Sequence, residues 1–138
     1  CMMLRKDVFE GVGGFREELA VAFNDIDLCM KVRASGKLVI YDPYVNFHHY
    51  ESKSRGLEDT PEKVARFNGE IATFAHYWGA ILEHGDPYYN TNLTLRKANF
   101  ALRDLTKEKP GEPYKLELDV EKQLATVLKE KARRGLKD

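Results

Sequence analysis

Apolar residues recur at alternating three- and four-residue steps through the middle of the chain. The residues of this stripe are Val64, Phe67, Ile71, Phe74, Trp78 and Ile81. That spacing places them on one face of an amphipathic helix. Thr60 can cap the start, Pro61 suits the first helical position, and Gly85 suits the end. The sequence therefore predicts a long helix over residues 60–84.

Shorter patterns predict three more helical segments. Residues 6–9 indicate a brief helical turn before a glycine-rich loop. A second helix begins near Asn24 or Asp25 and ends at Gly36, which suits the C-terminal cap. A last amphipathic helix covers residues 119–134, with its apolar side chains on one face.

Three short apolar runs predict β-strands, at residues 1–4, 38–41 and 45–48. β-Branched composition and bounding turn residues are typical of strands. Strands alternating with helices favour an α/β class, with a small mixed sheet and flanking helices. These runs are too few for a complete doubly wound sheet, and residues 1–4 have no polar segment before them. We therefore expect part of a domain, with a boundary inside a larger protein.

Composition narrows the function classes. The 138 residues are 43% hydrophobic and 32% charged, which is ordinary for a folded globular chain. Lys+Arg and Asp+Glu both number 22, so nothing in the charge favours nucleic acid or an anionic membrane as a partner. No apolar run is as long as a membrane span. The two cysteines form no framework, which favours a reduced, cytoplasmic protein.

Two carboxylates stand at the expected start of the second helix. Asp25 and Asp27 follow a loop that contains Gly13 and Gly14. A general base must present its carboxylate in a cleft, within hydrogen-bond reach of the proton it removes. The alternative is structural, because Asn and Asp are good N-caps and acids in the first turn offset the helix dipole. The spacing alone favours this structural alternative.

Two further clusters could bind ions. His48 and His49 are adjacent on an extended segment and point to opposite faces, so one at most faces a given cleft. One imidazole can complete the shell of a divalent cation, and packing at a strand end is the alternative. Residues 52–56 combine hydroxyls, Lys, Arg and Gly, which can hold a phosphate. A solvated loop is the alternative there.

In this order, the motifs resemble the second half of family 2 glycosyltransferases, in particular their rhamnosyltransferase-like and O-antigen-type members. The resemblance covers roughly residues 1–100 and is carried by residues 1–9 with 11–15, 23–29, Gly36 with 41–43, 49–56 and 85–93. One departure is Arg16, which stands where many relatives have an acid after Gly-Gly-Phe. We expect Arg16 to affect acceptor preference.

The resemblance implies a partial GT-A fold, the fold of nucleotide-diphospho-sugar transferases, with the N-terminal nucleotide-binding half missing. Residues 1–106 would be the acceptor-side half of the catalytic domain, and residues 107–138 a linker and an amphipathic helix. The implied reaction is an inverting transfer from a nucleotide-diphosphate sugar to a glycan acceptor, in cell-surface polysaccharide synthesis. Asp25 would be the general base. The implied acceptor-binding residues are Gly13, Gly14, Asn24 and Asp27.

The resemblance also implies a divalent cation, Mg²⁺ or Mn²⁺, because metal and cations must meet the charge of the leaving diphosphate. His49 would be the protein ligand, with His48 as the fallback, and Ser54 and Arg55 would contact the diphosphate. We expect this cation only in the full-length protein with its donor.

By itself, the chain is expected to be catalytically incompetent and prone to self-association. Its expected location is the cytoplasm, with the inner face of the membrane as a second placement. The rival functions are a non-catalytic binding or assembly module and a metal-dependent phosphoester hydrolase.

Overall fold

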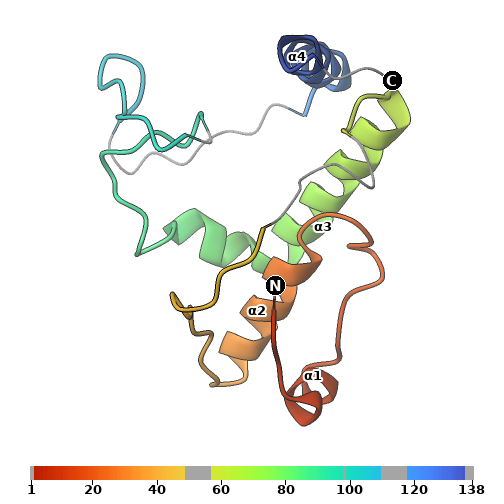
Figure 1. Cartoon of the computed structure of the whole chain (residues 1–138), viewed down its shortest axis with the longest axis vertical. Helices are drawn as coiled ribbons and strands as arrows, with labels where there is room; N and C mark the ends of the chain where they lie inside the picture. Colours follow the sequence, from red (N-terminus) through yellow and green to blue (C-terminus); the bar gives the residue numbers. More distant parts are fainter. Residues whose placement is uncertain (1, 49–56, 98, 110–117, 136–138) are drawn as a thin grey trace. The chain divides into compact units, whose positions relative to one another are not determined.

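The computed structural model describes residues 2–48, 57–97, 99–109 and 118–135 (Figure 1). Within these ranges the helices are α1 (Lys6–Gly11), α2 (Asn24–Ala34), α3 (Pro61–His84) and α4 (Val120–Arg133). Each one lies where the apolar pattern predicts a helix. The helical part of the sequence prediction is therefore confirmed.

The predicted sheet is not found in the described residues. Their β structure is limited to an isolated antiparallel bridge between Leu93 and Leu102. Residues 2–4, 38–41 and 45–48 form neither helix nor strand. β-Branched runs favour an extended backbone, but a strand also needs a neighbour to complete its hydrogen-bond ladder. The predicted α/β class, a partial GT-A fold with a mixed sheet, is therefore wrong, because the structure is helical.

Contacts within the chain define two compact units. The first unit comprises Cys1–Phe74 with Asp119–Asp138, and the second comprises Ala75–Leu118. Helix α3 contributes residues to both units. The sequence-based division between residues 106 and 107 stays a prediction.

The first unit has a small apolar core supplied mainly by α2 and α3. Its buried apolar residues are Leu19, Leu28, Val32, Val64 and Phe74. Phe23, just before α2, stacks on Phe67 and Phe74 of α3, with ring centroids 5.6 and 5.2 Å apart. Burial of these side chains is the main force that holds α2 to α3.

The predicted helix ends are also confirmed. Gly36 has φ +78°, and its N–H donates to the carbonyl of Arg33, while the N–H of Lys37 donates to that of Val32. This pair of bonds is a Schellman motif, which a glycine favours. At the start of α3, the Thr60 hydroxyl accepts a hydrogen bond from the Lys63 N–H at 3.3 Å.

Polar contacts organise the second unit. The buried Thr94 hydroxyl donates to the Glu108 carboxylate at 2.7 Å, and the Thr94 N–H donates to Ala101. The buried Arg103 guanidinium donates to the carbonyls of Leu93 and Lys109.

No helix in the described ranges combines the length and the apolar character that crossing a membrane requires. The cytoplasmic location stays a prediction.

Candidate functional site

The glycine-rich loop after α1 takes a conformation that favours glycine. Gly13 and Gly14 have φ values of +78° and +61°, in the left-handed region. The Gly14 N–H donates to the carbonyl of Phe9 at 2.9 Å. A Cβ placed on Gly14 would lie 3.1 Å from the Phe9 ring. Backbone conformation and close approach therefore both favour glycine at position 14.

A buried carboxylate ties this loop to α2. Asp27 is fully buried, and its Oδ1 accepts a hydrogen bond from Arg16 Nε at 2.8 Å. Its Oδ2 lies 2.9 Å from Lys31 Nζ, which also donates to the Gly14 carbonyl at 2.9 Å. Two cations compensate the loss of hydration that burial imposes on the Asp27 carboxylate. Asp27 thus holds the loop in place.

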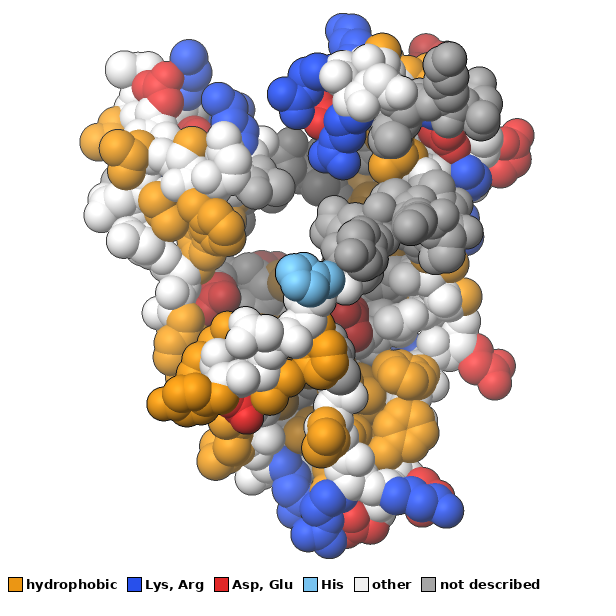
Figure 2. All heavy atoms as spheres, in the orientation of Figure 1, with side chains coloured by type: hydrophobic (Ala, Val, Ile, Leu, Met, Phe, Trp, Pro, Cys, Tyr) orange, Lys and Arg blue, Asp and Glu red, His pale blue; other side chains and the backbone are white. Residues whose placement is uncertain are grey.

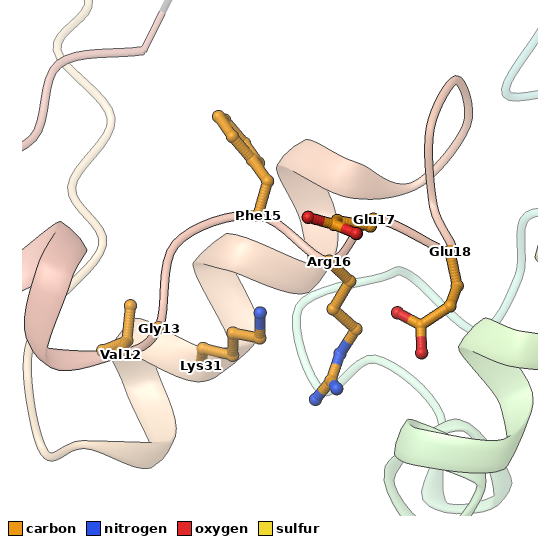
Figure 3. A pocket seen from close by; sticks show the side chains of 7 residues that line it. All are labelled: Val12, Gly13, Phe15, Arg16, Glu17, Glu18 and Lys31. Carbon is orange, nitrogen blue, oxygen red and sulfur yellow. The ribbon is translucent and has the colours of Figure 1, made fainter.

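A hollow of about 610 Å³ lies beside this cluster (Figure 3). Its lining residues are Val12, Gly13, Phe15, Arg16, Glu17, Glu18 and Lys31. Figure 3 shows the Arg16 and Glu18 side chains on one side of the loop and Phe15 on the other. Phe15 is 54% exposed and packs edge-on against Phe9.

The charges around the hollow disfavour an anionic ligand. Arg16 and Lys31 are paired with Asp27, whereas Glu17 and Glu18 form no ion pair with any described residue. The two cations and the three carboxylates, Asp27 included, therefore give this region one net negative charge. An exposed aromatic ring beside carboxylate acceptors suits an uncharged ligand with hydroxyl groups better than a phosphate.

The two acids of α2 have different environments. Residues two apart on a helix point about 200° away from each other. Asp25 is therefore on another face from Asp27. Its carboxylate is exposed and accepts a hydrogen bond from the Ile26 N–H at 2.9 Å. Burial raises the pKa of the Cys29 thiol, and the Asp25 charge adds to this effect.

The structural alternative for these acids is wrong in one respect. The N-cap of α2 is Phe23, which has φ +64° and provides no side-chain cap. Neither Asn24 nor Asp25 therefore caps the helix. Both acids do lie in the first turn, where a negative charge offsets the helix dipole.

The other predicted site residues are only partly placed. Gly13 lines the hollow, Gly14 contributes its carbonyl to Lys31, and Asn24 is half-buried at the start of α2. His48 is exposed. His49, Ser54 and Arg55 lie outside the described residues, so their predicted metal and diphosphate roles stay predictions. No group of three His, Cys, Asp or Glu side chains in the described part of the chain could hold a metal ion.

Sequence reasoning missed a second buried carboxylate, Glu70 of α3. Its two oxygens accept the N–H groups of Val21 and Ala22, at 3.0 and 3.1 Å, and Arg66 donates to it at 2.8 Å. The signal was available, because Glu70 lies three residues after Phe67 and four before Phe74, on the apolar face of the helix. A charged residue on a buried helix face is unusual unless it has partners.

An apolar groove of about 410 Å³ lies on the first unit. Its lining residues are Met2, Met3, Leu4, Leu28, Cys29, Val32, Leu38, Val39 and Ile40. Figure 2 shows hydrophobic side chains gathered at the surface in the segment after α2, where Leu38 and Ile40 are 84% and 80% exposed. A contiguous exposed apolar surface of this kind commonly marks an interaction site.

The chain is similar to segments of two much longer proteins. It is 47% identical to the uncharacterized protein y4gI of Sinorhizobium fredii over 103 residues, which make up 74% of this chain and 11% of that protein. It is 36% identical to the O-antigen biosynthesis protein RfbC of Myxococcus xanthus over 103 residues, or 75% of this chain and 8% of that protein. The chain thus spans a small part of the length of the curated relatives that it matches.

No protein-family model matches the chain, and no solved structure matches it. The similarity to an O-antigen biosynthesis protein agrees with the predicted role in polysaccharide synthesis. Membership of glycosyltransferase family 2 stays a prediction.

Proposed function

We propose that the chain is the acceptor-side segment of a glycosyltransferase in cell-surface polysaccharide synthesis. The full-length protein would transfer a sugar from a nucleotide-diphosphate donor to a glycan acceptor. Similarity to the O-antigen biosynthesis protein of Myxococcus xanthus supports the pathway. The observation that carries the proposal is the exposed Asp25 carboxylate, which has no cation partner among the described residues.

The contrast between the two acids supports Asp25 as the general base. Asp27 is buried against two cations, whereas Asp25 is open to solvent. Asp25 would accept the proton of the acceptor hydroxyl. The acceptor oxygen would then bond to the anomeric carbon from the side opposite the donor diphosphate. The bond to the diphosphate breaks, and its electron pair leaves with the diphosphate.

The predicted metal ligand, His49, lies outside the described residues. The predicted cation, Mg²⁺ or Mn²⁺, would depend on His49 and on donor oxygens. Its role would be to neutralise the leaving diphosphate.

The hollow suits the glycan acceptor. Phe15 offers an exposed ring, and Glu17 and Glu18 offer acceptors for sugar hydroxyls. Lys31 lines the hollow about 9 Å along the axis of α2 from Asp25, at 1.5 Å rise per residue. Because Asp25 also lies on another face of α2, a ligand that contacts both sites must be longer than one sugar ring.

The test is sugar transfer by the full-length protein, with a panel of nucleotide-diphosphate sugars and with glycan acceptors of increasing length. Asp25→Asn keeps the shape of the side chain and removes the base, so transfer should fall by about 10²-fold or more. Asp104→Asn, a substitution at another exposed aspartate, is the matched control and should leave turnover unchanged. Near-normal turnover of Asp25→Asn would refute the role of Asp25.

A non-catalytic binding module is the second candidate, and the exposed apolar groove favours it. A full-length protein that transfers no sugar from any donor would favour this candidate.

A further inference from the structure

The segment that enters α2 is held by a carboxylate from α3. Glu70 is 4% exposed, and each of its oxygens accepts one backbone N–H, Oε1 from Val21 and Oε2 from Ala22. Consecutive peptide groups bound by one planar carboxylate have little freedom to rotate. Hydrogen bonds to an ionised acceptor are stronger than those between neutral groups. Glu70 therefore fixes the backbone directly before Phe23.

Glu70 is itself held in place. Arg66, one turn earlier on α3, donates to Glu70 Oε2 at 2.8 Å and to Glu58 at 2.6 Å. These contacts satisfy the buried charge and restrict the Glu70 side chain to one orientation. Glu70 therefore holds the N–H groups of Val21 and Ala22 in fixed positions.

Phe23 links the backbone held by Glu70 to the first turn of α2. Its left-handed backbone, with φ +64°, is strained for a residue with a side chain. Stacking of its ring on Phe67 and Phe74 retains this conformation. The Phe23 carbonyl then accepts the N–H of Asp27 at 2.8 Å, the first hydrogen bond of the helix. The turn that carries Asp25 is thereby oriented by α3.

We propose that Glu70 is a positioning residue for the general base: by binding the N–H groups of Val21 and Ala22, it orients the first turn of α2 and hence the Asp25 carboxylate. The inference rests on the proposed function. Glu70 does not touch substrate, and it acts on the reaction only through Asp25.

The experiment is steady-state kinetics of the full-length protein with Glu70→Gln. Glutamine keeps the shape and one acceptor oxygen, but its NH₂ group cannot accept a backbone N–H. Displacement of a reacting group lowers the rate of the chemical step more than substrate binding. We expect kcat to fall about 10-fold or more, with the acceptor KM within about twofold of wild type. Glu83→Gln, an exposed glutamate on the same helix, should change neither.

A double-mutant cycle separates positioning from a general loss of structure. If Glu70 acts through Asp25, Glu70→Gln should have no further effect on kcat in the Asp25→Asn background. Equal fold-losses in both backgrounds would overturn the inference, as would an unchanged kcat in the single variant. Should Glu70→Gln fail to fold, Arg66→Gln leaves both backbone bonds and removes one supporting donor. That variant should lower kcat by a smaller factor, and the same cycle applies to it.

The outcome for wild type distinguishes the two levels of the proposal. Asp25-dependent transfer that does not respond to Glu70 would overturn only the positioning role. A wild-type protein without transfer activity would overturn the proposed function and this inference with it.

Discussion

Replacing Asp27 by alanine should destabilise the first unit strongly. The substitution leaves Arg16 and Lys31 close together without the carboxylate that they share at 2.8 and 2.9 Å. Removing one partner of a buried ion pair costs about 3–5 kcal/mol. The Arg16 and Lys31 side chains retain 23% and 13% of their exposure, so water can partly hydrate them. We therefore expect a loss at the lower end, about 3 kcal/mol.

The assay is urea unfolding of the chain followed by far-ultraviolet circular dichroism. With an m-value of about 2 kcal/mol/M, a loss of this size lowers the midpoint by about 1.5 M. Asp7→Ala is the matched control, because Asp7 forms a similarly short ion pair with Arg5, at 2.7 Å, on the exposed surface. Exposed pairs contribute little, so the midpoint of the control should not change measurably.

A second substitution identifies the origin of the loss. Lys31→Met in the Asp27→Ala background removes one of the uncompensated cations and should recover part of the midpoint. If Asp27→Ala unfolds at the same midpoint as Asp7→Ala, the buried cluster does not hold the glycine-rich loop. Burial of the Asp27 ion pairs would then add no measurable stability.

Two other predictions follow from local geometry. Gly14→Ala should lower the free energy of unfolding by about 1–3 kcal/mol, because position 14 has positive φ and lies against Phe9. Gly69→Ala, in the open middle of α3, should raise it by about 0.5–1 kcal/mol; urea midpoints that move in the same direction would contradict this pair. Bonds from Lys131 hold the pKa of Asp59 well below its usual range, so their stabilisation is complete above pH 3.8 and is lost as pH falls below it. Acidification should therefore lower the amide protection factors of α4, and Lys131→Ala should lower them at neutral pH. Unchanged protection factors in both experiments would contradict a stabilising contact between Asp59 and Lys131.

The helices were predictable because their signals are local. The stripe of α3, the Thr60 cap and the glycine after α2 depend on residues within a few positions of each other. The strands were not predictable in the same way. The run at residues 38–41 favours an extended backbone, but whether it pairs depends on residues elsewhere in the chain.

In the candidate site, too, local features were predictable from the sequence and long-range contacts were not. Helical spacing alone places Asp25 and Asp27 on different faces, but it does not say which acid is buried. That outcome depends on Arg16, eleven residues before Asp27. Glu70 carried a local signal, because it lies on the apolar face of its helix, whereas its backbone partners lie 48 and 49 residues away. Long-range polar partners are the part of a site that one sequence does not reveal.

The two buried carboxylates act on opposite ends of one loop. Asp27 of α2 binds Arg16 near the start, and Lys31 joins it to the Gly14 carbonyl. Glu70 of α3 binds the backbone at the far end, before Phe23. Both carboxylates are buried away from water, so their hydrogen bonds and ion pairs are stronger than the same contacts on the surface. The loop is thus fixed at both ends by polar contacts, while Asp25 stays exposed. A loop fixed in this way would support the general-base role that we propose for Asp25.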